Sequence, residues 1–188
     1  MLLPRAVSGL WGEGLVVMKL RHMGCEVEWD GGQTRDRDLR AGCASRDFHV
    51  QVKTSTAEDG RIAWRGSGAR AVEWASDVER LGMRAIFVLV HFPTAAEADF
   101  DLDRGLFQIQ LPEDAKVSVA SAHAFAAIVD IERELYGQRA RRRVGRNGEK
   151  IGDFLSPDGL AYPLLASQFP ALNRTNLKRA LARPRKIR

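Results

Sequence analysis

Cysteine, proline and long hydrophobic runs are all scarce in this chain of 188 residues. Two cysteines are too few for a disulfide scaffold, and neither has the CxxC or Cys/His spacing of a zinc site, so Cys25 and Cys43 are expected to be reduced, buried thiols. Seven prolines and 17 glycines without a fixed period exclude collagen-like, low-complexity and solenoid architectures. Apolar runs such as 85–90 are far shorter than the roughly 20 residues of a membrane-spanning helix. With no secretory signal in residues 1–5, a cytoplasmic location is expected.

The chain does contain enough apolar residues to bury a core, and its charge is unevenly distributed. Hydrophobic residues make up 45% and charged residues 28%, as in ordinary globular proteins. Residues 1–138 hold 16 basic and 21 acidic side chains, whereas 139–188 hold 13 and 3. This asymmetry favours an anionic polymer as partner, because phosphate contacts release counterions and add along a backbone. The alternative is a solvated tail that only aids solubility.

Periodicity predicts an α/β layered domain followed by a basic extension. We expect helices over 6–23, 69–81 and 121–136, strands over 25–29, 38–43, 48–54, 84–92 and 106–111, and an acidic loop over 99–104. The predicted domains are a core of residues 1–137 and a basic linker with a helical extension over 138–188. A basic helix over 173–182 is expected to pack Leu177 and Leu181 on the body.

Two alternating runs around residues 44–47 predict a β-hairpin. With that turn, Cys43 lies opposite Phe48, and the register continues to Asp38 opposite Lys53 and Arg40 opposite Gln51. Side chains alternate along a strand, so the members of each set share one face. The core-facing set is Phe48, Val50 and Val52, and the available set is His49, Gln51 and Lys53.

The available face of this hairpin carries groups suited to metal-assisted phosphodiester cleavage. Mg²⁺ prefers oxygen ligands, usually one or two carboxylates with water and substrate phosphate. Asp38 supplies a carboxylate, and the Gln51 side chain and the Val52 carbonyl supply neutral oxygens. Lys53 can orient the attacking water or stabilise charge on the phosphate. Glu13, on the first helix, would add a second carboxylate if that helix packs across the end of the hairpin.

Glu13 lies between two glycines that weaken the predicted helix. Gly12 and Gly14 each lower helix stability by roughly 1 kcal/mol relative to alanine. We therefore expect that something other than helix propensity selects them. Their small size also leaves the Glu13 carboxylate approachable.

These residues together resemble the nuclease core of the PD-(D/E)XK superfamily, in its QxK variant. The resemblance covers about residues 8–92: Glu13 on a helix, Gly24 at the turn, Asp38 opening one strand and the tripeptide 51–53 on the next. Holliday-junction resolvases and modification-dependent restriction endonucleases share this superfamily. The resemblance implies a restriction-endonuclease-like mixed sheet flanked by helices, and an endonuclease that uses Mg²⁺ or Mn²⁺.

The resemblance also implies partners and roles for the site residues. DNA is the expected substrate, with RNA as an alternative, and many such nucleases form homodimers so that two sites address two strands. Asp38, Glu13, Gln51 and Lys53 would be the catalytic set. Most members have an acidic residue where this chain has Gln51, and Asp38 follows Arg37 instead of proline. The glutamine removes one negative charge, which should weaken metal affinity unless substrate compensates.

Basic residues near the predicted cleft and in the extension are the candidates for binding nucleic acid. They are Arg40, His49, Arg139, Arg141, Arg142, Arg143, Arg146, Lys178 and Arg179. Such contacts would give affinity with little sequence choice. A basic cluster at a helix end can instead interact with the carbonyl dipole or remain solvated.

Other interpretations of the same residues remain open. Asp36, Glu28 or Asp30 could replace Asp38 as the ligand, and Asp36 is the strongest rival. The polar strand face could simply be solvated. At the level of function, the alternatives are a nucleic-acid-binding protein that keeps the nuclease-like fold without catalysis, and an interaction module that recruits protein partners.

Overall fold

The computed structural model describes residues 5–29, 37–43, 46–56, 60–65, 68–93, 97–101, 106–110, 112–142 and 161–182. Its elements are α1 (Arg5–His22), β1 (Glu26–Trp29), β2 (Leu39–Cys43), β3 (Arg46–Ser55), β4 (Arg61–Arg65), α2 (Gly68–Arg80), β5 (Arg84–His91), β6 (Glu97–Asp101), β7 (Leu106–Gln110), β8 (Lys116–Ser121), α3 (Ala122–Arg142), β9 (Ala161–Leu165), a 3₁₀ turn (Ala166–Gln168) and α4 (Arg174–Ala180).

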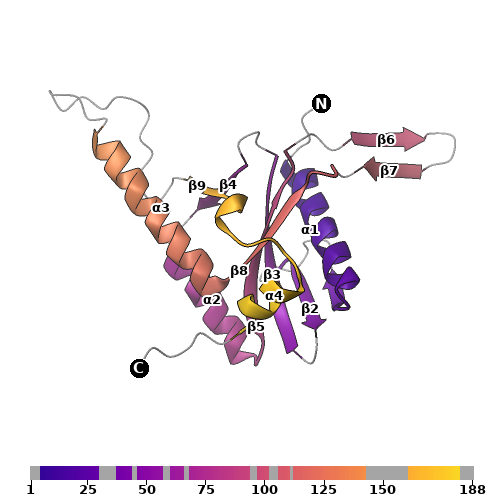
Figure 1. Cartoon of the computed structure of the whole chain (residues 1–188), viewed down its shortest axis with the longest axis horizontal. Helices are drawn as coiled ribbons and strands as arrows, with labels where there is room; N and C mark the ends of the chain where they lie inside the picture. The colour runs from indigo at the N-terminus through magenta and orange to yellow at the C-terminus, as the bar shows by residue number, and fades with distance from the viewer. Residues whose placement is uncertain are drawn as a thin grey trace.

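The body of the protein is a five-stranded mixed sheet with the strand order β1-β2-β3-β5-β8. The β3–β5 pair is parallel, whereas the neighbouring pairs are antiparallel. Two smaller sheets pair β4 with β9 and β6 with β7, and the β6–β7 hairpin projects away from the body (Figure 1). The predicted α/β fold, a mixed sheet flanked by helices, is confirmed.

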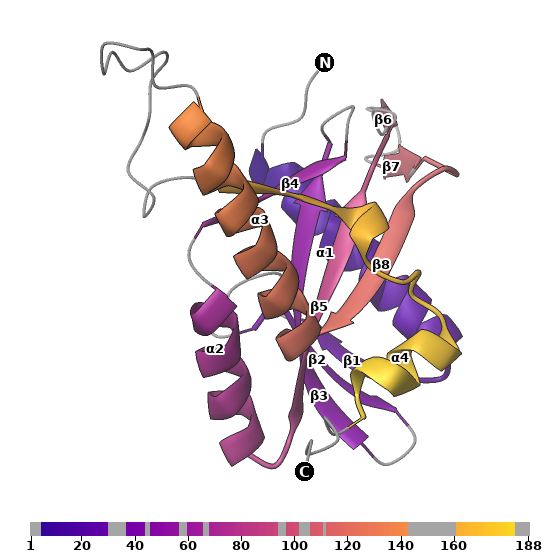
Figure 2. The ribbon, with the colours of Figure 1, turned by 60° about the vertical axis from the view of Figure 1, so that its left-hand side comes forward.

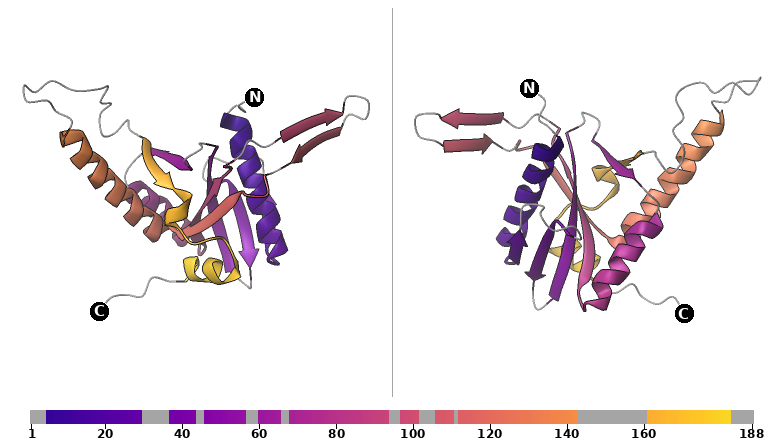
Figure 3. Two further views of the ribbon diagram at one scale, coloured as in Figure 1. Left: turned by 45° about the horizontal axis from the view of Figure 1, so that its top comes forward. Right: turned by 180° about the vertical axis from the view of Figure 1, so that it is seen from behind.

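Helices cover both faces of this sheet. Figures 1 and 2 show α1 on one face of the sheet, with α4 near the lower end of α1, and α2 and α3 on the other face. The two views of Figure 3 show the same arrangement. Paired residues on β3 and β5 alternate between the two layers, so Val50 and Ile86 join the core under α1, whereas Phe87 stacks on Phe125 of α3 at 4.0 Å. Burial of each such side chain stabilises the fold by about 1.5–3 kcal/mol.

The C-terminal helix α4 is attached to the sheet through β8. The backbone of Val119 donates to the Pro170 carbonyl at 2.9 Å, and that of Leu172 donates to the Val117 carbonyl at 2.7 Å. Leu177 and Leu181 are 3% and 4% exposed and belong to the core under α1. The expected packing of both leucines is therefore confirmed.

Several predicted boundaries are displaced. α3 continues to Arg142 instead of ending near 136, so the predicted domain division at residue 138 falls inside a helix. In the extension, β9 pairs with β4 of the core. The acidic loop predicted over 99–104 is wrong at its start, because residues up to Asp101 form β6, which pairs with β7. The hydrophobic pattern predicted β7 but missed β4, β6 and β9, because β4 and β9 pair with each other across a long stretch of sequence and β6 lies outside the main sheet.

The prediction of two reduced thiols is also wrong. Cys25 and Cys43 form a disulfide, with their Cα atoms 4.5 Å apart. The β1–β2 ladder pairs Glu26 with Gly42, which brings the two cysteines opposite each other just past that pair. Strand pairing decides this contact, and the cysteine spacing alone gives no sign of it.

No helix in the described part of the chain is long and apolar enough to cross a membrane.

Candidate functional site

The β2–β3 hairpin has a register two residues away from the predicted one. Arg40 pairs with His49 instead of Gln51, and β3 begins at Arg46, within the predicted turn. Side chains alternate with a period of two, so an even shift keeps every residue on its predicted face. Continuing the observed register by one residue places Asp38 opposite Gln51 instead of Lys53.

The Asp38 carboxylate is bound to the backbone of β3. Asp38 Oδ2 accepts the Val52 N–H at 2.6 Å, and the Asp38 N–H donates to the Val50 carbonyl at 3.1 Å. β2 begins only at Leu39, whereas β3 continues to Ser55, so β3 extends beyond its neighbour. The carboxylate replaces the missing strand partner of Val52. The structure thus fixes this acid beside the Gln51-Val52-Lys53 tripeptide.

Gln51 and Lys53 lie on the same face of β3, and both are half-buried. In the parallel ladder Gln51 pairs with Phe87 and Lys53 with Leu89, two residues of the core beneath α2 and α3. Val52 points the other way, into the core under α1. The structure therefore brings Asp38, Gln51 and Lys53 together at the end of β2, with the Val52 backbone between them.

Glu13 approaches this region from α1. The Trp29 indole N–H donates to Glu13 Oε2 at 2.9 Å. Trp29 pairs with Leu39, the residue that follows Asp38. Glu13 is thus held one residue pair from Asp38, on the α1 side of the sheet, whereas Lys53 lies on the opposite side. Because β3 extends beyond β2 here, no described strand lies between the two faces of the sheet at this edge.

The two glycines beside Glu13 allow α1 to lie close to its neighbours. A Cβ atom added at Gly12 would clash with the side chain of Thr54 on β3, and one added at Gly14 would lie 3.8 Å from the Trp29 ring. Helix packing therefore explains these residues. Sequence reasoning singled out the glycines but missed Trp29, whose only signal was its position at the end of a predicted strand.

The donor atoms fit a hard divalent cation. Two carboxylates, Asp38 and Glu13, with the amide oxygen of Gln51 and the carbonyl of Val52 would make an all-oxygen set of the kind that Mg²⁺ and Mn²⁺ prefer. Among the residues described, no group of three or more His, Cys, Asp and Glu side chains could hold a metal ion. A cation at this edge would therefore depend on neutral oxygens and substrate phosphate.

The rival ligands are placed only in part. Asp30 and Asp36 lie outside the described residues. Glu28 lies 3.6 Å from Arg40 in an ion pair, and Asp47 accepts from the same guanidinium at 3.1 Å.

Arg40 is on the face predicted for it, but two carboxylates already compensate its charge. The prediction that His49 is available to bind nucleic acid is wrong, because its side chain is only 4% exposed; the hairpin and β5 bury it.

The structure describes only some of the basic residues that were predicted to contact nucleic acid. The last turns of α3 contain Arg139, Arg141 and Arg142, but the structure describes only the backbone of these residues. The described residues do not include Arg143 and Arg146. Lys178 and Arg179 are exposed on α4. Of the predicted contacts from residue 138 onward, these two therefore have described side chains at the surface.

Comparisons with known proteins transfer neither residue roles nor activity to this chain. No protein-family profile and no curated protein matches the chain. Among solved structures, the chain is similar to the 1.6 Å structure of Hjc, a Holliday junction resolvase from the archaeal hyperthermophile Archaeoglobus fulgidus. The two chains are 14% identical with a TM-score of 0.35, and the match covers 63% of this chain and 98% of that chain. At this level the match carries no conclusion about the fold, the site residues or the activity of this chain.

Proposed function

We propose that the protein is an endonuclease that hydrolyses phosphodiester bonds with Mg²⁺ or Mn²⁺, with DNA as the substrate. The observation that carries this proposal is the Asp38 carboxylate, held by the Val52 N–H at 2.6 Å between Gln51 and Lys53. This anchored acid, an amide oxygen and an ammonium group share one sheet edge, where both metal and phosphate can be bound.

Each residue has a separate task in the proposed reaction. Asp38, Gln51, the Val52 carbonyl and Glu13 would hold the cation, which when bound polarises the phosphate and lowers the pKa of its water. The Val52 N–H keeps the Asp38 carboxylate in one orientation, and the Trp29 indole does the same for Glu13. Lys53 places its ammonium group at the attacking water or at a phosphate oxygen, where negative charge develops.

Gln51 makes the proposed site one charge less negative than a site with glutamate there. Cation binding then depends more on the substrate phosphate, which completes the oxygen ligands. We expect weak metal affinity without DNA and stronger affinity with it.

Cleavage assays with matched variants test the proposal. The protein is incubated with plasmid, linear and branched DNA, and with RNA, in Mg²⁺, Mn²⁺ or EDTA. Asp38→Asn keeps an acceptor for the Val52 N–H but removes the charge, and Lys53→Met removes the ammonium group; both should abolish metal-dependent cuts. Lys116→Met, at an exposed lysine on β8, is the control and should cut normally. Cleavage that persists in Asp38→Asn would contradict the proposal.

Gln51 also favours a second candidate function, nucleic-acid binding without cleavage, because the substitution removes a carboxylate from the proposed ligand set. Gln51→Glu separates the two candidates. If the natural site is active, this variant should bind Mn²⁺ on the order of tenfold more tightly, equal to about 1.4 kcal/mol, and should still cut. If only the variant cuts, the natural protein is the binding protein.

A further inference from the structure

A basic groove lies at the end of the β2–β3 hairpin opposite to Asp38. Two adjoining cavities of about 730 and 550 Å³ form it, and they share Met23 and Arg174. Their walls come from the C-terminal end of α1, the end of β2, the start of β3 and the length of α4. The lining residues are Met18, Lys19, His22, Met23, Gly24, Cys43, Arg46, Leu172, Asn173, Arg174, Leu177, Lys178, Leu181 and Ala182.

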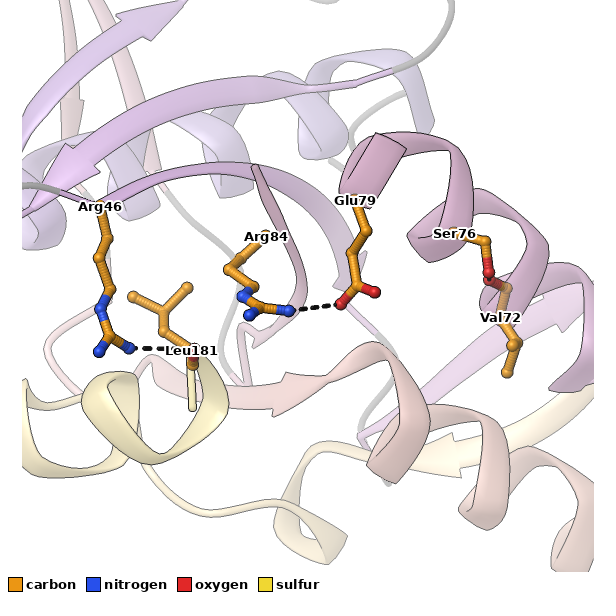
Figure 4. A network of polar contacts seen from close by, with 6 residues as sticks. All are labelled: Arg46, Val72, Ser76, Glu79, Arg84 and Leu181. Atoms are coloured by element: carbon orange, nitrogen blue, oxygen red, sulfur yellow. Dashed lines mark hydrogen bonds and ion pairs between the residues drawn. The ribbon is translucent and has the colours of Figure 1, made fainter. Parts of the chain in front are cut away.

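The charge of this groove is of one sign. Lys19, Arg46, Arg174 and Lys178 line it together with His22, and none of its described lining residues is an aspartate or glutamate. Arg46 donates to the Leu181 carbonyl at 3.4 Å, a neutral acceptor that leaves its positive charge in the groove (Figure 4).

The cations just outside the groove have an acidic neighbour. Figure 4 shows Arg84 paired with Glu79, at 2.7 Å. Arg179, the neighbour of Lys178 on α4, lines a separate cavity of about 150 Å³ that includes Arg84 and Glu79. Acidic residues thus accompany the cations there, whereas the described residues that line the groove include cations and no acid.

The groove also has an apolar floor. Met23, Leu177 and Leu181 line it, with the Cys43 end of the disulfide beside them. A duplex presents phosphates on its outside and keeps its bases stacked inside, so its base faces cannot contact an apolar floor. A single strand presents both phosphates and the faces of unpaired bases. Unpaired bases stack on aromatic side chains in charged grooves, and flipped bases pack between aromatic or apolar side chains.

We propose that this groove binds a single-stranded segment of nucleic acid, with phosphates on Lys19, Arg46, Arg174 and Lys178 and bases against the apolar floor at Met23. The groove is separate from the proposed catalytic residues: Arg46 and Val52 are six residues apart on β3, or roughly 20 Å. Binding there needs neither a metal ion nor cleavage, and so it goes beyond the proposed nuclease function.

Fluorescence anisotropy in EDTA tests this proposal independently of catalysis. The probe is a labelled, mixed-sequence oligonucleotide of about 16 nucleotides, the upper end of the usual site size for one single-strand-binding domain. The groove variant is Arg174→Gln with Lys178→Gln. The control is Arg70→Gln with Arg133→Gln, two exposed arginines on α2 and α3 that change the net charge equally. Met23→Gln tests the apolar floor.

We expect the groove variant to bind more weakly and to lower the slope of log K against log salt by about 1.4, or 0.7 for each lost phosphate contact. The control should keep the natural slope, and Met23→Gln should weaken binding without changing the slope. Unlabelled single strand should compete better than duplex. The Asp38→Asn protein should bind the oligonucleotide normally, so a failed nuclease proposal leaves this result intact.

Four results would overturn the proposal. They are an equal loss in groove and control variants, duplex that competes as well as single strand, no binding of the oligonucleotide by the natural protein, and binding only to anionic phosphatidylserine vesicles. The last result would assign the groove to a membrane surface.

Discussion

The two ends of the β2–β3 hairpin differ in both charge and construction. At the Asp38 end, acids and an amide are held by contacts with neighbouring strands, such as the Val52 N–H to Asp38 bond across 14 residues. At the Arg46 end, cations gather because α4 packs there, and Arg46 contacts Leu181 across 135 residues. A site built from adjacent strands follows from a hairpin register. A groove built by a distant helix depends on the whole fold.

Removing the anchor of α4 should produce the largest effect and should separate the two ends. Leu177→Ala truncates a side chain that is 3% exposed, so we expect a loss of about 2–5 kcal/mol in unfolding free energy. Single-strand binding should be lost while cleavage at the Asp38 end persists below the unfolding transition. Urea unfolding and anisotropy measure both. Leu81→Ala, at a leucine that is 67% exposed, is the control and should change stability by less than about 0.5 kcal/mol.

The disulfide should have the next largest effect, because it closes a loop between residues that are 18 positions apart. Replacing Cys25 and Cys43 by serine should lower stability by about 3 kcal/mol through the greater entropy of the unfolded chain. Reduced natural protein should unfold at the same urea concentration as the double variant. Identical midpoints for oxidised and reduced natural protein would contradict this prediction.

The indole that holds Glu13 should have a smaller effect, confined to the Asp38 end. Trp29→Phe keeps an aromatic ring but removes the N–H that donates to the carboxylate, so Mn²⁺ affinity measured calorimetrically should fall about tenfold. Trp74→Phe is the control, because Trp74 contacts Phe87 on the α2 side of the sheet. A variant that loses stability but keeps its metal affinity would show that Trp29 is structural only.

Arg40 lies between the two ends and should have the smallest effect. Its partners Glu28 and Asp47 are exposed, and exposed ion pairs contribute only about 0–1 kcal/mol. Arg40→Gln should therefore change stability slightly and leave the salt dependence of duplex binding unchanged. A decrease of about 0.9 in that slope would reveal one phosphate contact and restore the role first predicted for Arg40.

Local patterns predicted the fold class and the neighbourhood of the candidate site. Alternation along β3 assigned Val50 and Val52 to the core and Gln51 and Lys53 to the available face, as observed. The error of two residues in the hairpin register did not alter these assignments, because the period of a strand is also two. The burial of His49 was not predicted, since that face of β3 becomes partly covered only when β5 and its helices are in place.

Contacts between distant segments were beyond the reach of those patterns. The Cys25–Cys43 bond, the pairing of β4 with β9 and the contact of Gly12 with Thr54 each join residues whose sequence context gives no sign of the partner. Trp29 was missed for the same reason: its indole acts on a residue 16 positions away, across a helix and a turn.

The sequence by itself determined which residues alternate, which helices form and where the basic charge lies, because these properties depend on neighbours within a few positions. Only the tertiary structure decided that the Asp38 carboxylate completes the ladder of an overhanging strand, and that α4 closes a groove lined by cations. Those outcomes depend on how far one strand extends past another and on where a distant apolar helix face is buried, which no local spacing encodes.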